Sequence, residues 1–287
     1  GFGFIANIDN IPKHEIIHQA LEIVHNLDHR GAVSADPLAG DGAGILIQIP
    51  DEFFRLELAE KNYSLPELGN YGVGIIFFPN SQPEINKLKR IIKNIITKEG
   101  LELICWRDVP VNSAVLGVSV KANEPSIKQL FIRKGKRLKS ENELERKLYV
   151  VRKLITNTLH KDKIYDENFY IPSLSTRTIV YKGMVLAPNL SKYYLDFQNK
   201  SFKSAMAMLI FSGVVFSATS SRQTSYASGC CSRTTFGSSF SWVLLTRFQT
   251  RISLIPSSSP SETASFDLIR SISKSVLKIS PRSSMYS

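Results

Sequence analysis

The chain has 287 residues, of which 43% are hydrophobic, and this length allows one large domain or two small ones. Its formal net charge is +11, but residues 1–208 hold 28 basic and 23 acidic side chains (+5), while residues 209–287 hold 8 and 2 (+6). Because the longer part is only mildly basic, its charge requires no nucleic acid or other polyanionic partner. The 3 cysteines exclude a disulfide framework and favour a reducing compartment. No run of about 18 apolar residues is present to span a membrane.

Residues 1–208 alternate between strand-like and helical patterns. The alternation over 2–7 predicts a strand buried on both faces, and apolar residues at helical spacing predict an amphipathic helix over 13–27. We expect further strands over 45–49, 72–78, 101–106, 115–120, 129–133, 170–174 and 178–181, and further helices over 83–97, over 138–159 and from 202 to 210. Short, turn-rich connections favour antiparallel pairing and an α+β fold class.

The segment from Asn26 to Ile45 is the most informative part of the sequence. It reads Asn-Leu-Asp-His-Arg-Gly-Ala-Val-Ser-Ala-Asp-Pro-Leu-Ala-Gly-Asp-Gly-Ala-Gly-Ile and holds five charged or imidazole side chains and four glycines. Glycine frees the backbone for positive φ and for close approach. A charged cluster at such a turn indicates a functional site rather than a solvated surface.

Together with the opening residues Gly1-Phe-Gly-Phe-Ile-Ala-Asn7, this segment resembles the start of the glutamine amidotransferase domain of glutamate synthase. That family begins Cys-Gly-Val-Gly-Phe and continues into a Leu-Asp-His-Arg-Gly-Ala segment. The similarity persists at 106–111 and 169–184 and is last seen at 204–208, so we place a partial type-2 amidotransferase domain at 1–208. The resemblance implies an N-terminal-nucleophile (Ntn) hydrolase fold, an αββα sandwich, here truncated.

The resemblance also implies a mechanism. In the family, the thiolate of a cysteine immediately before Gly1 attacks the glutamine side chain, and the free α-amine of that cysteine is the base. Ammonia is released for the synthesis of glutamate from 2-oxoglutarate. Residues expected to support the site are Gly1, Gly3, Arg30, Gly31, Asp41 and Gly42.

Arg30 would brace the loop that carries the nucleophile, and the alternative is an ordinary salt bridge between Arg30 and Asp28 at a helix end. The turn 40–44 would lie beside the glutamine pocket, although by itself it is read as a tight turn into a core strand. The printed chain starts at Gly1, and after Met208 it departs from the His-x-Arg-Phe-Ser-Thr-Asn of the family. We therefore expect the printed chain to be inactive.

The expected cofactors and partners follow from the same resemblance. We expect no cofactor in this chain, with FMN and an iron–sulfur cluster in the parent enzyme. The expected partners are glutamine, the remainder of the glutamate synthase polypeptide and its electron donor, either nicotinamide or ferredoxin. We expect no nucleic acid and no membrane, and a cytoplasmic location, or a plastid if the source is a photosynthetic eukaryote.

The pattern H-E-x-x-H at His14-Glu15-Ile-Ile-His18 matches that of zinc proteases. At about 100° per residue, His14, Glu15 and His18 fall on the side of the helix opposite its apolar residues, whereas a catalytic zinc helix lines a buried cleft. We therefore expect no metal site. The basic run Lys87, Lys89, Arg90 and Lys93 is interpreted as a solvated helix face in the same way.

Two arginines outside the central segment are open to more than one interpretation. Trp106-Arg107-Asp108 is expected to provide packing and a local ion pair. Arg177 lies between two predicted strands, where it could reach a substrate carboxylate or have a structural role.

The composition changes at about Leu209. Serine rises from 12 of 208 residues to 23 of the last 79, and the acidic residues there are Glu262 and Asp267 alone. A disordered segment this rich in serine usually carries fewer Phe, Leu and Ile. Residues 209–287 are therefore interpreted as out of frame, mis-spliced or wrongly sequenced, with a real disordered tail as the alternative. If the tail is a real part of the protein, the chain would be a non-catalytic degenerate fragment or an interaction module.

Overall fold

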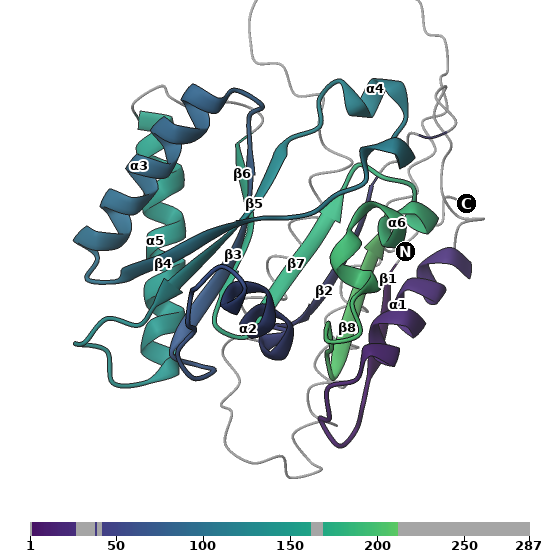
Figure 1. The fold of residues 1–287 in the computed structure, drawn as a ribbon, viewed down its shortest axis with the longest axis horizontal. Coiled ribbons are helices and arrows are strands. Elements are labelled where there is room, and N and C mark those ends of the chain that lie inside the picture. The colour runs from purple at the N-terminus through teal and green to yellow at the C-terminus, as the bar shows by residue number, and fades with distance from the viewer. Residues whose placement is uncertain (1, 27–37, 39–41, 162–168, 212–287) are drawn as a thin grey trace, which may run out of the picture. The chain divides into compact units, whose positions relative to one another are not determined.

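The computed structural model describes residues 2–26, 38, 42–161 and 169–211, and these form a mixed fold of helices and sheets (Figure 1). The α+β class expected from the sequence is consistent with this arrangement. In chain order the elements are β1 (Phe2–Ala6), α1 (His14–Asn26), β2 (Ala43–Gln48), α2 (Asp51–Ala59), β3 (Tyr71–Phe78), α3 (Gln82–Lys98), β4 (Glu102–Asp108), η2 (Ser113–Val115), α4 (Val118–Lys121), β5 (Ser126–Arg133), α5 (Glu141–Lys161), β6 (Tyr170–Ser175), β7 (Thr178–Gly183), η3 (Ala187–Asn189), α6 (Leu190–Tyr193), η4 (Leu195–Gln198) and β8 (Met206–Phe211).

The strands form two four-stranded sheets, with the orders β1-β8-β2-β7 and β4-β5-β3-β6. All the described strand pairs within them are antiparallel, as the short connections predict. The chain passes from the second sheet to the first at the turn between β6 and β7, where the backbone N–H of Val180 donates to Ser173 Oγ at 3.1 Å. This turn therefore joins an edge strand of one sheet to an edge strand of the other.

Helices α3 and α5 lie side by side along the sheet β4-β5-β3-β6 (Figure 1). Their apolar faces pack on one side of that sheet, where Phe78 and Ile132 are fully buried. Lys87, Arg90 and Lys93 of α3 are exposed, as the spacing predicts. Lys89 is half-buried instead, because its ammonium lies over the Trp106 ring, 5.1 Å from the centroid.

The second core cluster brings α1, α2 and both sheets together. Ile16, Ile17 and Ala20 of α1 are buried in the same cluster as Ile45 of β2 and Val73 of β3. Helix α1 therefore packs on one face of the sheet β1-β8-β2-β7, and the same face contributes to the core shared with the sheet β4-β5-β3-β6. The helix runs beside β8 and β1 (Figure 1).

The expectation that β1 is buried on both faces is wrong. Helix α1 covers the face that holds Gly3 and Ile5, but Phe2 and Phe4 on the other face are 58% and 38% exposed. The reason is topological, since β1 is an edge strand that pairs with β8 alone among the described strands. An alternating apolar sequence shows that both faces can be buried, but not whether a neighbouring element covers them.

The sequence patterns are also wrong at two other segments. Residues 115–120 are not a strand: they hold the end of η2 and the start of α4, and Asn112 Oδ1 accepts from the backbone N–H of Ala114 at 3.1 Å. Residues 206–211 are a strand and not a helix, because β8 pairs with β1 on one side and β2 on the other. A continuous apolar run does not distinguish a buried helix from a central strand.

Candidate functional site

The sheet β1-β8-β2-β7 has one end at which several expected site residues meet. Phe2 of β1 pairs with Ile210 of β8, and Ala43 of β2 pairs with both Phe211 of β8 and Gly183 of β7. The N-terminal ends of β1 and β2 therefore lie at the same sheet end, separated by β8 and roughly 10 Å apart. We take this sheet end as the candidate site.

The structure describes two of the six expected site residues at this end. Gly42 is buried and has a φ of 107°, a left-handed conformation that favours glycine at the start of β2. Gly3 pairs with Leu209, and a Cβ at Gly3 would lie 2.9 Å from Cγ2 of Ile23. Gly3 thus permits the close approach of α1 to β1. Gly1, Arg30, Gly31 and Asp41 lie outside the described residues, as does Asp28.

A buried lysine lies close to the same sheet end. Lys182, one residue before the end of β7, is 7% exposed, and its ammonium is 4.1 Å from the centroid of the Tyr170 ring. Burial, and next the positive charge of Arg152, lower the pKa of Lys182 to about 7. The Tyr194 hydroxyl donates to the Lys182 carbonyl at 2.6 Å and ties this part of β7 to the end of α6.

The strongest polar cluster among the described residues surrounds Arg107, whose side chain is 2% exposed. Its guanidinium donates to both carboxylate oxygens of Asp196 at 2.8 and 2.9 Å, to Glu57 at 2.9 Å and to Gln129 at 2.9 Å. Tyr181 donates its hydroxyl to Asp196 at 2.9 Å and accepts from Gln129 at 2.7 Å.

This cluster joins both sheets through side chains from β4, β5, β7, α2 and η4. Burial alone lowers the pKa of Arg107, but the hydrogen bonds and charge of Asp196 outweigh it and hold that pKa above the usual value. Burial, with Asp196, raises the pKa of the Tyr181 hydroxyl well above its usual value. Arg107 is therefore a permanent cation and Tyr181 a neutral donor, which suits a structural cluster better than proton transfer.

The expectation of a local ion pair within Trp106-Arg107-Asp108 is wrong in its partners. Arg107 and Asp108 point to opposite sides of β4, as neighbours on a strand must. Arg107 pairs with Asp196 and Glu57, while Asp108 pairs with Lys128 on the adjacent strand. The sequence signal that was available is an arginine directly after the apolar run 103–106 of the predicted strand.

Arg177 has protein partners at the turn between β6 and β7. Its Nε donates to Glu141 at 2.9 Å, and a terminal nitrogen donates to Asn142 Oδ1 at 2.6 Å. Both partners lie at the start of α5. Of the two interpretations left open by the sequence, these contacts favour the structural one.

The residues of the H-E-x-x-H pattern lie where the helix geometry predicts, with Glu15 and His18 exposed and His14 half-buried. The His14 Nδ1 is 2.8 Å from the carbonyl oxygen of Phe202, so this ring fastens α1 to the segment before β8. Within the described ranges, no three His, Cys, Asp or Glu side chains form a possible metal site.

Comparison with known proteins defines the class of this fold and site. The family model of the class II glutamine amidotransferases matches residues 1–217, about three quarters of the chain, so the chain belongs to that family. The resemblance drawn from residues 1–208 is thereby confirmed.

The relatives that the chain matches are glutamate synthases. It is 41% identical over 209 residues to the glutamate synthase [NADPH] large chain of Bacillus subtilis, covering 73% of this chain and 13% of that protein. It is 39% identical over 208 residues to ferredoxin-dependent glutamate synthase 1, chloroplastic/mitochondrial, of Arabidopsis thaliana, with 72% and 13% covered. It is 38% identical over 208 residues to ferredoxin-dependent glutamate synthase 2 of Synechocystis, with the same coverage. The chain spans about 13% of the length of these curated relatives.

Within the part of the chain that the structure describes, no helix has both the length and the hydropathy that crossing a bilayer would need.

Proposed function

We propose that this chain is the glutamine-hydrolysing part of a glutamate synthase. The match to the class II glutamine amidotransferases and the identity to three glutamate synthases support the proposal. The observation that carries it is the pairing that brings the start of β1 and the start of β2, just after Gly42, to one sheet end. A cysteine ahead of Gly1 would come directly before β1 in the sequence, and the charged segment 28–41 directly precedes Gly42.

The proposed reaction is the hydrolysis of glutamine to glutamate and ammonia. The thiolate of a cysteine ahead of Gly1 attacks the side-chain amide, and its own α-amine takes the thiol proton and passes it to the leaving ammonia. Water then cleaves the thioester, releasing glutamate and the free thiol. Arg30 is proposed to hold the loop around the nucleophile, through a guanidinium that can make several hydrogen bonds at once.

The proposed reaction needs a cysteine ahead of Gly1 as its nucleophile. Removing a catalytic nucleophile costs several orders of magnitude in rate. By resemblance, the oxyanion donors that follow the family's His-x-Arg-Phe segment are absent from residues 209–287. We therefore propose that residues 209–287 do not complete the catalytic site.

We further propose that the described sheets and helices are the first part of an Ntn αββα sandwich. Helices α3 and α5 would form one outer layer, and the two sheets the inner layers. The fourth layer would cover the face of the first sheet that carries Phe2 and Phe4. Residues 1–208 would constitute the amidotransferase part, with 209–287 as a separate segment.

FMN and an iron–sulfur cluster are proposed for the remainder of the parent polypeptide. The described residues do not fit a cluster, since Cys105 is their one cysteine and it is buried in β4. Burial raises the pKa of its thiol to about 11, so the thiolate that ligates iron is disfavoured. The electron donor, NADPH or ferredoxin as in the names of the relatives, would act on that remainder, in a cytoplasm or a plastid.

A chimera tests the proposal. Residues 1–208 replace the matching part of the Bacillus subtilis glutamate synthase, whose own cysteine precedes them and whose own sequence follows. We expect glutamate synthesis from glutamine, and we expect Arg30→Ala to reduce it by at least tenfold. Synthesis from added ammonia, which bypasses glutamine hydrolysis, should remain unchanged.

The matched control is Arg133→Ala, because Arg133 is exposed and forms an ion pair with Glu102 at 3.8 Å, far in sequence from the site. It should leave both activities unchanged. A chimera that makes glutamate from ammonia but not from glutamine would refute the proposed function of residues 1–208.

A further inference from the structure

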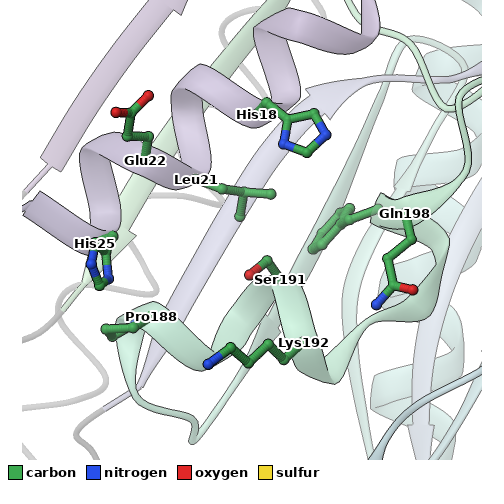
Figure 2. A pocket seen from close by; sticks show the side chains of 9 residues that line it. His18, Leu21, Glu22, His25, Pro188, Ser191, Lys192 and Gln198 are labelled. Atoms are coloured by element: carbon green, nitrogen blue, oxygen red, sulfur yellow. The ribbon is translucent and has the colours of Figure 1, made fainter.

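A groove lies between α1 and the segment that runs from η3 to η4 (Figure 2). Its volume is about 560 Å³, within the range of about 300–1,000 Å³ that is typical of small-molecule sites. Its apolar lining comes from Leu21, Pro188 and Phe197. We call it the α1–α6 groove.

The polar side chains of the groove are one ammonium (Lys192), one carboxylate (Glu22) and several groups that can both donate and accept a hydrogen bond. His25 lies at one end near Pro188, Ser191 is in the middle, and Lys192 and Gln198 extend along the same wall as Ser191 (Figure 2). Glu22, the one carboxylate of the lining, points away from Ser191 in Figure 2. Around Ser191, the lining therefore presents one permanent positive charge and neutral groups that can donate a hydrogen bond.

The side chains of Lys192 and Gln198 are exposed to solvent, and that of Ser191 is half-buried. Within the described part of the chain, no hydrogen bond or ion pair engages the side chains of Ser191, Lys192 or Gln198, and Glu22 and Lys192 form no salt bridge although they line the same groove. The groove thus combines an apolar floor with donors that lack an acceptor among the described residues.

From this combination we propose that the α1–α6 groove binds a small carboxylate with an apolar body. The apolar body would lie on Leu21, Pro188 and Phe197, and the carboxylate would accept from Lys192 and Ser191. One permanent cation matches a single negative charge, whereas a phosphate dianion is normally held by two or more. This site is independent of the proposed glutamine hydrolysis, because none of its residues belongs to the expected catalytic set.

The test uses the full 287-residue chain and two probes of the same shape, benzoate and its neutral counterpart benzamide. For ligands of this size, a dissociation constant on the order of 1 mM is expected for benzoate. We expect benzamide to bind at least tenfold more weakly, since a hydrogen bond to a charged group is lost. Titrations followed by ligand-observed NMR at one fixed pH measure both constants.

Two variants locate the binding. Lys192→Gln should weaken benzoate binding about tenfold and leave benzamide binding unchanged. Lys200→Gln is the matched control, because Lys200 is exposed, lies close in sequence and does not line the groove; it should leave both constants unchanged. Ser191→Phe should abolish the binding of both probes by filling the groove, with the circular dichroism spectrum unchanged.

Equal affinities for benzoate and benzamide, no detectable benzoate binding, or an effect of Lys200→Gln as large as that of Lys192→Gln would each overturn the proposal. None of these results depends on glutamine hydrolysis.

Discussion

Replacing Asp196 by alanine should destabilise the chain more than any surface change. Asp196 is 3% exposed and accepts two hydrogen bonds from Arg107 and one from Tyr181. Its removal leaves a buried guanidinium without its closest counter-charge, which typically costs about 3–5 kcal/mol. Arg107 keeps Glu57 at 2.9 Å and Gln129, so we expect the lower end of that range, about 3 kcal/mol.

Urea unfolding of the 287-residue chain, followed by circular dichroism, measures this cost as a change in the free energy of unfolding. The matched control is Asp108→Asn, because the Asp108 carboxylate is 79% exposed and forms a surface ion pair with Lys128. Such pairs contribute about 1 kcal/mol or less.

A double variant separates the charge from the packing. Arg107→Met with Asp196→Leu removes both buried charges and should be less destabilised than Asp196→Ala alone, because the one carboxylate left without Arg107 is that of Glu57, which is 29% exposed. A cost below about 1 kcal/mol for Asp196→Ala would refute the reasoning, since it would mean that the buried pair contributes no more than a surface pair.

Three further predictions concern single residues. Tyr181→Phe removes a buried hydroxyl that bonds Asp196 and Gln129 and should lower the free energy of unfolding by about 1–2 kcal/mol in the same urea assay; no change would contradict the bonds assigned to it. Gly42→Ala should cost about 1–2 kcal/mol because its φ of 107° disfavours a side chain, whereas Gly183→Ala, with an added Cβ 3.7 Å from Val185, should be nearly neutral; equal thermal melts would contradict this. Lys182 has a pKa of about 7 in the folded state, below its value in the unfolded state. Between pH 7 and about pH 10 the unfolded state therefore binds more protons than the folded state. The contribution of Lys182 to the free energy of unfolding thus rises with pH across that window. Lys182→Met should reduce that rise in urea midpoints measured from pH 6 to 10, and an unchanged pH profile would show that Lys182 is charged in the folded state.

The sequence predicts best where the apolar pattern is long and has one period. Helices α1, α3 and α5 begin and end within three residues of the predicted bounds 13–27, 83–97 and 138–159. Helix α2 was missed because it is short, although Pro50 and the acidic residues Asp51 and Glu52 mark its first turn. The exposed face of β1 and the central position of β8 depend on strand order, which no local pattern contains.

The residues of the candidate site were also predictable from the sequence only in part. Resemblance singled out Gly3 and Gly42. The φ of 107° at Gly42 and the close approach of Ile23 to Gly3 explain why glycine is needed at these positions. The Arg107–Asp196 pair could not be found from spacing, because its two residues are 89 positions apart and are joined only when the two sheets pack. The α1–α6 groove likewise depends on how the segment from η3 to η4 packs against α1.

The central claim is that residues 1–208 come from a working amidotransferase, and the sequence of the transcript tests it most directly. Reading should extend from upstream of Gly1 through the codons for Met208 to Phe240. The account predicts a cysteine codon directly before Gly1 and, after Met208, a His-x-Arg-Phe-Ser-Thr segment in another frame. A transcript that reads as printed after Met208, with another codon before Gly1, would contradict it.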